Sequence, residues 1–163
     1  MIQKVSDKRK KMHQLIIQHL GDAVLSASDS GYRPLFLELN KPTKINLTVY
    51  LFPNTNPPGG RSADEYKFNL CVPGQKPGMR GDFDNTKGLP LLISYTEEYD
   101  VYIIYDADKH FNFMCNANIQ SKQSLILEAC RKQIATYIKK NGETLIAVTS
   151  QNLIEGIRKR LQM

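Results

Sequence analysis

Apolar and polar side chains alternate through the middle of this chain. In residues 44–52 (KINLTVYLF), apolar residues occupy every second position from Ile45 to Leu51. This period of two is typical of a strand with one buried face. Similar strand character recurs in residues 35–40, 66–72, 91–95, 101–105, 117–121 and 143–149. The pattern favours a mainly antiparallel sheet or an open barrel over alternating βαβ units.

A helical period marks both ends of the chain. Ser6 is a candidate N-cap for a helix within residues 1–25, whose apolar side chains fall on one face. Residues 122–140 look helical over their first half, and the last segment predicts a helix capped at Thr149 or Ser150. We therefore expect an α+β, mainly β fold in one domain. Its parts are an N-terminal helix in residues 1–30, a core in residues 32–150 and a C-terminal helix in residues 150–163.

Two long loops separate the predicted strands. Residues 53–65 contain three prolines and two glycines, and residues 73–88 are rich in glycine and basic side chains. Such clusters of glycine and proline exclude regular structure over most of their length. We expect both segments to lie on the surface.

Composition narrows the class of protein. Hydrophobic residues make up 41% and charged residues 23% of the chain, as in an ordinary soluble domain. No apolar run approaches the roughly 20 residues of a membrane span, so we expect a cytoplasmic protein with no membrane partner. Cys71, Cys115 and Cys130 form no CxxC pair. We therefore expect reduced thiols, and neither a disulfide framework nor a zinc site.

Motifs of common enzyme classes are absent from the sequence. The chain holds no GxSxG, GxxxxGK[ST], HExxH or GxGxxG motif. One enzymatic alternative stays open, since a small magnesium-dependent endonuclease could combine carboxylates with Lys67. Its candidate carboxylates are Glu65, Asp82, Asp84, Asp106 and Asp108. Because Glu-x-Lys triplets are common by chance, we expect no catalytic residue, no metal and no cofactor in this chain.

Side chains suited to DNA collect in the loops, and the net charge of +6 favours a polyanionic partner. Arginine and lysine pair with guanine, asparagine and glutamine pair with adenine, and lysines hold phosphates. The first group of candidates is Asn54, Asn56, Arg61 and Ser62. The second group is Lys109, His110, Asn112, Asn116, Asn118, Gln120 and Lys122, with Lys76 and Arg80 as additional phosphate contacts. The alternative is that these asparagines form ordinary turns, because asparagine tolerates a left-handed backbone.

Three segments in order carry a resemblance to a known family. They are GGRSADEYKFNL, RGDFDNTKGLPLLISYTEEYDVYIIYDADKH and ANIQSKQSLILEA. The order, and the DADKH ending of the long segment above all, resembles the plant B-three-like DNA-binding domain of prokaryotic restriction endonucleases, as in LlaJI-type and McrB-type restriction subunits. The resemblance covers about residues 44–150. The chain departs from the family pattern at Ser94, where glycine is expected, and at Tyr105, where tryptophan is expected.

The resemblance implies a fold and a function. The implied fold is a seven-stranded open pseudobarrel, and the implied function is sequence-specific binding of double-stranded DNA as the target recognition module of a restriction–modification system in phage defence. Two arms would grip the major groove: an N-arm at residues 54–65 and a C-arm at residues 106–122. Asp106 and Asp108 would stiffen the turn of the C-arm, since carboxylates repel phosphates.

This reading places catalysis in another domain or subunit of a restriction complex, which is the further partner we expect beside DNA. A protein-interaction module of such a complex, with an incidental basic surface, is the remaining alternative.

Overall fold

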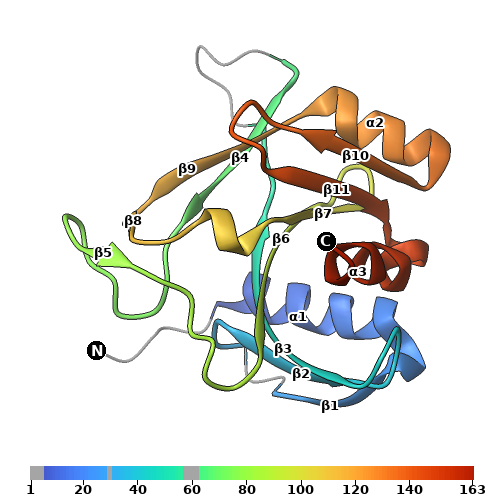
Figure 1. Cartoon of the computed structure of the whole chain (residues 1–163), viewed down its shortest axis with the longest axis horizontal. Coiled ribbons are helices and arrows are strands. Elements are labelled where there is room, and N and C mark those ends of the chain that lie inside the picture. Colours follow the sequence, from blue (N-terminus) through green and yellow to red (C-terminus); the bar gives the residue numbers. More distant parts are fainter. Residues whose placement is uncertain (1–5, 29–30, 57–62) are drawn as a thin grey trace.

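The computed structural model describes residues 6–28, 31–56 and 63–163. Its centre is one seven-stranded sheet in the spatial order β1-β2-β3-β6-β7-β11-β10 (Figure 1). In that order the strands span Val24–Ala27, Leu35–Leu39, Ile45–Pro53, Leu89–Thr96, Val101–Tyr105, Thr144–Thr149 and Ile134–Ile138. The sheet and its flanking helices confirm the predicted α+β, mainly β class and the open seven-stranded pseudobarrel.

The sheet is mixed because two of its inner strands run in parallel. β3 pairs with β6 in parallel, with Val49 opposite Leu91, whereas the other pairs of this sheet are antiparallel. A parallel pair requires a long crossover connection. The crossover here is the chain between the two strands, and it carries one strand of each of the two ribbons that lie outside the sheet.

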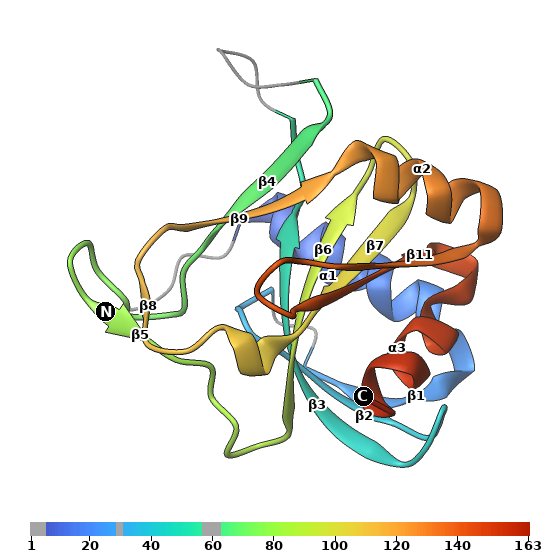
Figure 2. The same ribbon diagram turned by 45° about the horizontal axis from the view of Figure 1, so that its top comes forward.

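The two ribbons are short and antiparallel. β4 (Glu65–Leu70) pairs with β9 (Ala117–Lys122), and β5 (Arg80–Gly81) pairs with β8 (Phe113–Met114). Figures 1 and 2 show both ribbons reaching away from the sheet on the same side of the molecule. β9 confirms the strand predicted at residues 117–121. The predicted C-arm is therefore irregular only in its first part, because its second part is paired with β4.

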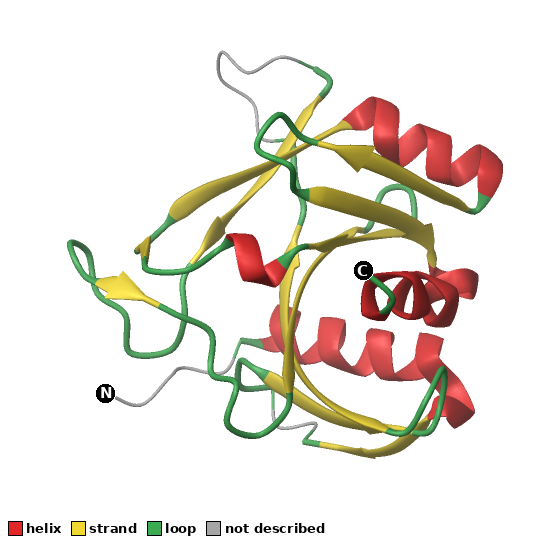
Figure 3. Cartoon of the chain, viewed as in Figure 1, coloured by secondary structure: helices red, strands yellow, loops and turns green. Residues whose placement is uncertain are grey.

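Three α-helices flank the strands (Figure 3). They are α1 (Asp7–Leu20), α2 (Gln123–Lys132) and α3 (Leu153–Leu161). The predicted cap is confirmed, since the Ser6 hydroxyl accepts a hydrogen bond from the Arg9 N–H at 3.1 Å. α1 ends earlier than predicted because Gly21, at a φ of 57°, turns the chain out of the helix. A 3₁₀ turn (Gly21–Ala23) then leads into β1, so the sheet begins inside the segment assigned to the N-terminal helix.

Two boundaries in the last third of the chain follow from local chemistry. α2 confirms the helical half of residues 122–140, and it ends at Gln133, which adopts a φ of 72°. The β-branched residues Ile134, Thr136 and Ile138 then form β10, in line with their strand propensity. Thr149 precedes a 3₁₀ turn (Ser150–Asn152) rather than the α-helix itself, which begins at Leu153.

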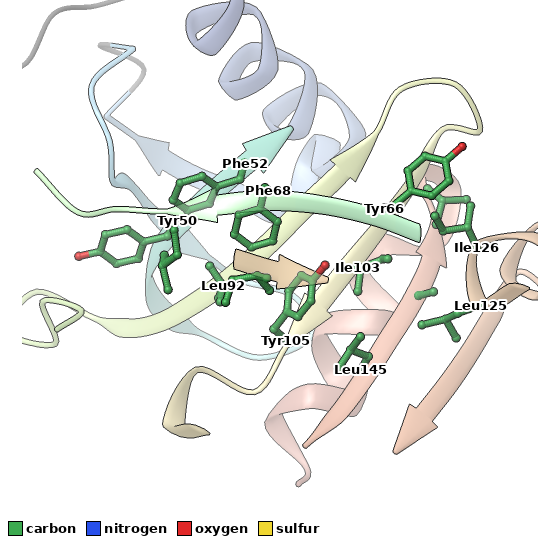
Figure 4. Packing of buried hydrophobic residues seen from close by; sticks show 14 of the residues in the cluster. Tyr50, Phe52, Tyr66, Phe68, Leu92, Ile103, Tyr105, Leu125, Ile126 and Leu145 are labelled. Atoms are coloured by element: carbon green, nitrogen blue, oxygen red, sulfur yellow. The ribbon is translucent and has the colours of Figure 1, made fainter. Parts of the chain in front are cut away.

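Each face of the sheet is covered by a different layer. α1 and α3 cover one face with Ile16, Leu20 and Leu153, which pack on Ile93 and Ile146 of the strands. On the other face, the β4–β9 ribbon and α2 pack on aromatic and aliphatic side chains of the strands (Figure 4). The labelled members of this second cluster are Tyr50, Phe52, Tyr66, Phe68, Leu92, Ile103, Tyr105, Leu125, Ile126 and Leu145. The inner face of the ribbon thus packs on the sheet.

Within the described ranges, no helix combines the length and the apolar character that a membrane crossing requires.

Candidate nucleic-acid interface

The β4–β9 ribbon sorts its side chains by strand alternation. Tyr66, Phe68 and Leu70 of β4 face inward, as do Ile119 and Ser121 of β9. The opposite side, which we call the outer face of the ribbon, consists of Glu65, Lys67, Asn69, Asn118, Gln120 and Lys122. These residues are exposed or half-buried. Alternation therefore turns an apolar side toward the sheet and a continuous polar side toward solvent.

The outer face has a defined order of cross-strand pairs. Lys67 lies opposite Gln120, Asn69 lies opposite Asn118, and Glu65 lies opposite Lys122. Side chains that are directly opposite in an antiparallel pair have Cβ atoms about 4.5–5.5 Å apart. Each pair thus presents its polar groups together. Lys67 and Asn69 were not among the predicted DNA contacts, although the alternation of residues 66–72 places them on the other side of the strand from Phe68.

Aromatic rings hold the ribbon on the sheet. Phe68 stacks on Phe52 with ring centroids 4.8 Å apart, and it meets the edge of Tyr105 at 5.5 Å. The Tyr105 hydroxyl lies 3.0 Å from the Ser94 hydroxyl in the interior. Tyr105 and Ser94 are the two positions where the sequence departs from the expected family pattern. The structure joins both departures in one hydrogen bond, so the polar tip of this tyrosine has a buried partner.

Asn54, predicted in the N-arm, lies in the interior. Its side chain is 4% exposed, and its amide nitrogen donates to the hydroxyls of Thr96 and Ser121, each at 3.1 Å. The backbone of Thr55 adds a bridge to Lys67 with N–O distances of 2.8 and 3.0 Å. These contacts tie the end of β3 to β6 and to the ribbon. We therefore correct the prediction for Asn54: it joins the ribbon to the sheet and does not reach a base edge.

The remaining N-arm residues divide into two groups. The Asn56 amide donates to the carbonyl of Ala63 at 2.6 Å, which closes the loop before β4. Arg61 and Ser62 lie outside the described residues, so their predicted roles stay predictions.

The C-arm begins with a tightly bonded turn. Asp106 accepts a hydrogen bond from the Asp108 N–H at 3.0 Å, ahead of the 3₁₀ turn Ala107–Lys109, and binds Arg160 at 3.0 Å. Asp106 thus stiffens this turn, as predicted, whereas the outer Asp108 carboxylate is exposed. Lys109 is also exposed, on the turn itself.

His110 has a different partner from the one predicted. Its Nε2 lies 2.7 Å from Oε2 of Glu143, whose side chain is 1% exposed. Lys139 and the Asp106 N–H also approach this carboxylate. Burial alone would raise the pKa of Glu143, but the hydrogen bond and charge of His110, with Lys139 and the Asp106 N–H, hold it below its usual value. The Nε2 atom of His110 is thus engaged by a buried carboxylate, and its predicted contact with DNA stays a prediction.

The asparagines of the C-arm serve both readings that the sequence left open. Asn112 and Asn116 adopt φ values of 49° and 64°, so each fills a turn position that suits asparagine. Both also remain exposed, and Asn118 follows on the outer face of the ribbon. The turn role and a surface role therefore coexist in this segment.

Further basic side chains lie at the β5–β8 ribbon. Lys76 and Arg80 are exposed there, and the Arg80 guanidinium donates to the carbonyl of Asn112 at 3.1 Å. Gln75 holds this tip, because its amide nitrogen donates to the carbonyls of Met79 and Phe113 at 3.1 and 2.9 Å. Nothing in the residue type of Gln75 distinguishes it from a surface glutamine in sequence.

The candidate carboxylates of the endonuclease alternative do not form a metal-binding cluster in the described residues. Asp84 binds the Thr86 N–H and hydroxyl at 2.8 and 2.6 Å, and these hydrogen bonds lower its pKa. Asp82 accepts from the Asn112 N–H at 2.6 Å. Across residues 6–28, 31–56 and 63–163, no three histidine, cysteine or acidic side chains lie close enough together to hold a metal ion.

A cavity adjoins the outer face. It has a volume of about 480 Å³ and lies between β9, α2 and β10. Gln120 and Lys122 line one side, Tyr137 lines the other, and Leu125 contributes apolar surface.

One comparison with known proteins gives a match. The family model described as methylase-associated X1 matches residues 45–157, which include all of the ribbon and most of the sheet. No curated protein and no solved structure matches the chain. The family is linked to restriction–modification systems, which agrees with the context that the resemblance implied, without extending to its B-three-like type. Since the match spans more than half of the sequence, the chain belongs to the methylase-associated X1 family.

Proposed function

We propose that this protein binds double-stranded DNA and recognises the target site of a restriction–modification system. The observation that carries the proposal is the outer face of the β4–β9 ribbon. It presents Lys67 beside Gln120 and Asn69 beside Asn118 on a two-stranded antiparallel ribbon. The family assignment supplies the restriction–modification context.

The shape of the ribbon suits the major groove of DNA. The groove is about 12 Å wide and admits either one helix or a two-stranded ribbon. Its base edges offer acceptors on guanine to lysine, and a donor–acceptor pair on adenine to asparagine or glutamine. Asn118 and Gln120 are therefore the proposed base-reading residues, with Lys67 and Asn69 opposite them on β4.

Basic side chains beside the ribbon suit the phosphate backbone. Lys76 and Arg80 lie at the β5–β8 ribbon, and Lys109 lies on the 3₁₀ turn before β8. Lys122 is the last residue of β9. Lys122 also lies 3.9 Å from Asp64, an exposed contact that costs little to exchange for a phosphate. Such contacts fix the position of a protein on DNA without reading its sequence.

The ribbon relates directly to the two arms that the sequence predicted. β4 follows the N-arm, and β9 forms the last part of the C-arm. In our proposal the ribbon joins the roots of the arms, and together they grip one groove. Cleavage and methyl transfer belong to other domains or subunits in this proposal.

The test is a selection of randomised duplexes at moderate salt, in separate unmodified and methylated pools. We expect a short enriched motif, with the logarithm of affinity falling against the logarithm of salt by about 0.9 per phosphate contacted. Gln120→Ala should relax the choice at one base pair. Gln151→Ala is the matched control, because Gln151 is an exposed glutamine in the 3₁₀ turn before α3. Uniform weak binding that vanishes with salt would refute sequence recognition.

A protein-interaction role is the second candidate, and one observation favours it. β10 is an outer strand of the sheet, and its Tyr137 and Ile138 side chains are 49% and 68% exposed. An outer strand with exposed apolar groups can pair with a strand of another protein. Absence of DNA affinity at low salt, together with binding of a restriction or methylase subunit that is lost in Ile138→Lys, would replace the first proposal by this one.

A further inference from the structure

Two cysteines from distant parts of the chain meet at one end of the β4–β9 ribbon. Cys71 directly follows β4, and Cys115 lies between β8 and β9. Their sulfur atoms are 3.2 Å apart. The closest strand pair to them is Leu70 opposite Ala117. The third cysteine, Cys130, is exposed on α2 and takes no part in this arrangement.

The surroundings hold the two thiols in register. The carbonyl oxygen of Gln75 lies 3.6 Å from the Cys71 sulfur and 3.9 Å from the Cys115 sulfur. The Cys115 N–H donates to the carbonyl of Met79 at 3.2 Å, which fixes the backbone of Cys115 against the β5–β8 tip. Both residues are half-buried, which leaves the pair accessible to a small reagent.

We propose that Cys71 and Cys115 form a site of reversible oxidation, in which an intramolecular disulfide closes across the end of the ribbon. The co-reactant is a low-molecular-weight disulfide such as oxidised glutathione. One cysteine thiolate attacks a sulfur of that disulfide and expels a small thiolate, which leaves a mixed disulfide on the protein. The second cysteine then attacks the protein sulfur of the mixed disulfide and releases the second small thiol. The two cysteines lose two electrons and two protons, and the small disulfide gains them.

The sequence predicts reduced thiols, and the proposed site adds a reversibly oxidised form to that prediction. Burial, followed by the hydrogen bond and charge of Cys115, raises the pKa of Cys71, and the backbone N–H of Asn116 and the charge of Arg33 oppose this only in part. The thiolate is the reacting form. A raised pKa lowers the thiolate fraction at neutral pH, so thiol–disulfide exchange at Cys71 should become faster as the pH rises.

The bond would cross-link the chain from residue 71 to residue 115, a stretch that includes β5, β6, β7 and β8. It would pin the end of the outer face at Asn118, together with the preceding Asn116, against the β5–β8 tip. This consequence for recognition rests on the proposed function, whereas the disulfide itself does not.

The test is a titration of the whole chain with glutathione redox buffers, read by thiol counting and by peptide mass. Cys130→Ser serves as the background, so that two thiols remain. We expect both thiols to disappear together as one Cys71–Cys115 linked peptide. Oxidation of the folded chain should be favoured at least about tenfold over the same pair in urea, which corresponds to about 30 mV. The oxidised form should also unfold at a temperature higher by at least about 5 °C.

Two single variants in the same background keep the result decisive. Cys71→Ser and Cys115→Ser should each hold one glutathione in a persistent mixed disulfide. Persistent mixed disulfides on both cysteines of the background protein, or no preference over the pair in urea, would overturn the proposal. No arm of this titration uses DNA, so its failure is distinct from a failure of the proposed function.

Discussion

The two faces of the central sheet differ in what covers them. Under α1 and α3 the buried contacts are mostly between leucine, isoleucine and valine side chains. Under the ribbon they include rings from both partners, such as Phe68 on Phe52 and Tyr105. A two-stranded ribbon is only marginally stable by itself. The ribbon therefore depends on a few large side chains for its position, whereas α1 and α3 are held by many aliphatic contacts.

The largest effect should come from breaking the ring contacts. Phe68→Ala should lower the free energy of unfolding by about 3–5 kcal/mol, because it removes a buried ring between two others. Hydrogen exchange should show β4 and β9 opening before the rest of the sheet. Ile93→Ala on the opposite face is the matched control, with a cost of about 2–5 kcal/mol and no selective opening of the ribbon. Equal protection of β4 and β9 in both variants would remove the distinction between the faces.

The next largest effect on stability should come from the contact between Glu143 and His110 of the C-arm, and this effect depends on pH. Glu143→Gln should cost about 1.5–3 kcal/mol at neutral pH, because it weakens a charged hydrogen bond to His110. The folded-state pKa of Glu143 lies below 4.5, its ordinary value. Its contribution to stability is therefore present above that value and is lost as the pH falls through the folded pKa.

Denaturation in urea at several pH values measures this contribution. The loss of stability between neutral and acidic pH should be smaller in Glu143→Gln than in the native chain. Glu155→Gln is the control, since Glu155 forms only an exposed pair with Arg158. An identical pH dependence in all three proteins would contradict the role assigned to Glu143.

The junction between the ribbon and the sheet at Asn54 should be sensitive to the loss of its side-chain amide. Asn54→Ala should cost about 1–3 kcal/mol, because the buried hydroxyls of Thr96 and Ser121 lose a partner. Asn56→Ala should cost less, since its hydrogen bond to the Ala63 carbonyl is exposed. Thermal unfolding of both variants compares them, and a smaller loss in Asn54→Ala than in Asn56→Ala would contradict the interior role.

The smallest effect on stability should come from the outer face. Gln120→Ala and Asn118→Ala should each change the free energy of unfolding by less than about 0.5 kcal/mol. On DNA, each should lose about 1–3 kcal/mol of discrimination at one base pair, if it reads that pair as proposed. Binding assays on the selected site and on single-base variants measure this. A uniform loss on every sequence would assign the residue to the phosphate backbone.

Many of the strands were predictable because strand alternation is local. The strands around residues 44–52, 66–72, 91–95 and 101–105 all occur near their predicted positions. β1 was missed because Val24 continues the apolar face of the preceding helix. β10 was missed because it follows α2 after the single residue Gln133, whose left-handed conformation the sequence does not reveal.

The candidate site was predictable only in part, because it depends on pairing at long range. Nothing local indicates that residues 65–70 pair with residues 117–122. Asn54 and Asn118 are the same residue type near the ends of strands, yet one is buried and the other exposed. The partner of His110, Glu143, lies 33 positions further along the chain. Burial and pairing of this kind follow from the assembled fold and not from residue type.

The crossover between β3 and β6 has a consequence for folding order. β4 precedes β6 in the chain, and β9 follows β7. The two strands of the ribbon therefore come from two separate segments that leave the sheet. Pairing between distant segments has to overcome the entropy of closing the chain between them, which slows folding. The outer face therefore exists only once β4 and β9, which are separated in the chain by β5, β6, β7 and β8, have paired. A nascent or partly unfolded chain would carry the sequence of the ribbon without its surface, so any partner of that surface would select fully folded molecules.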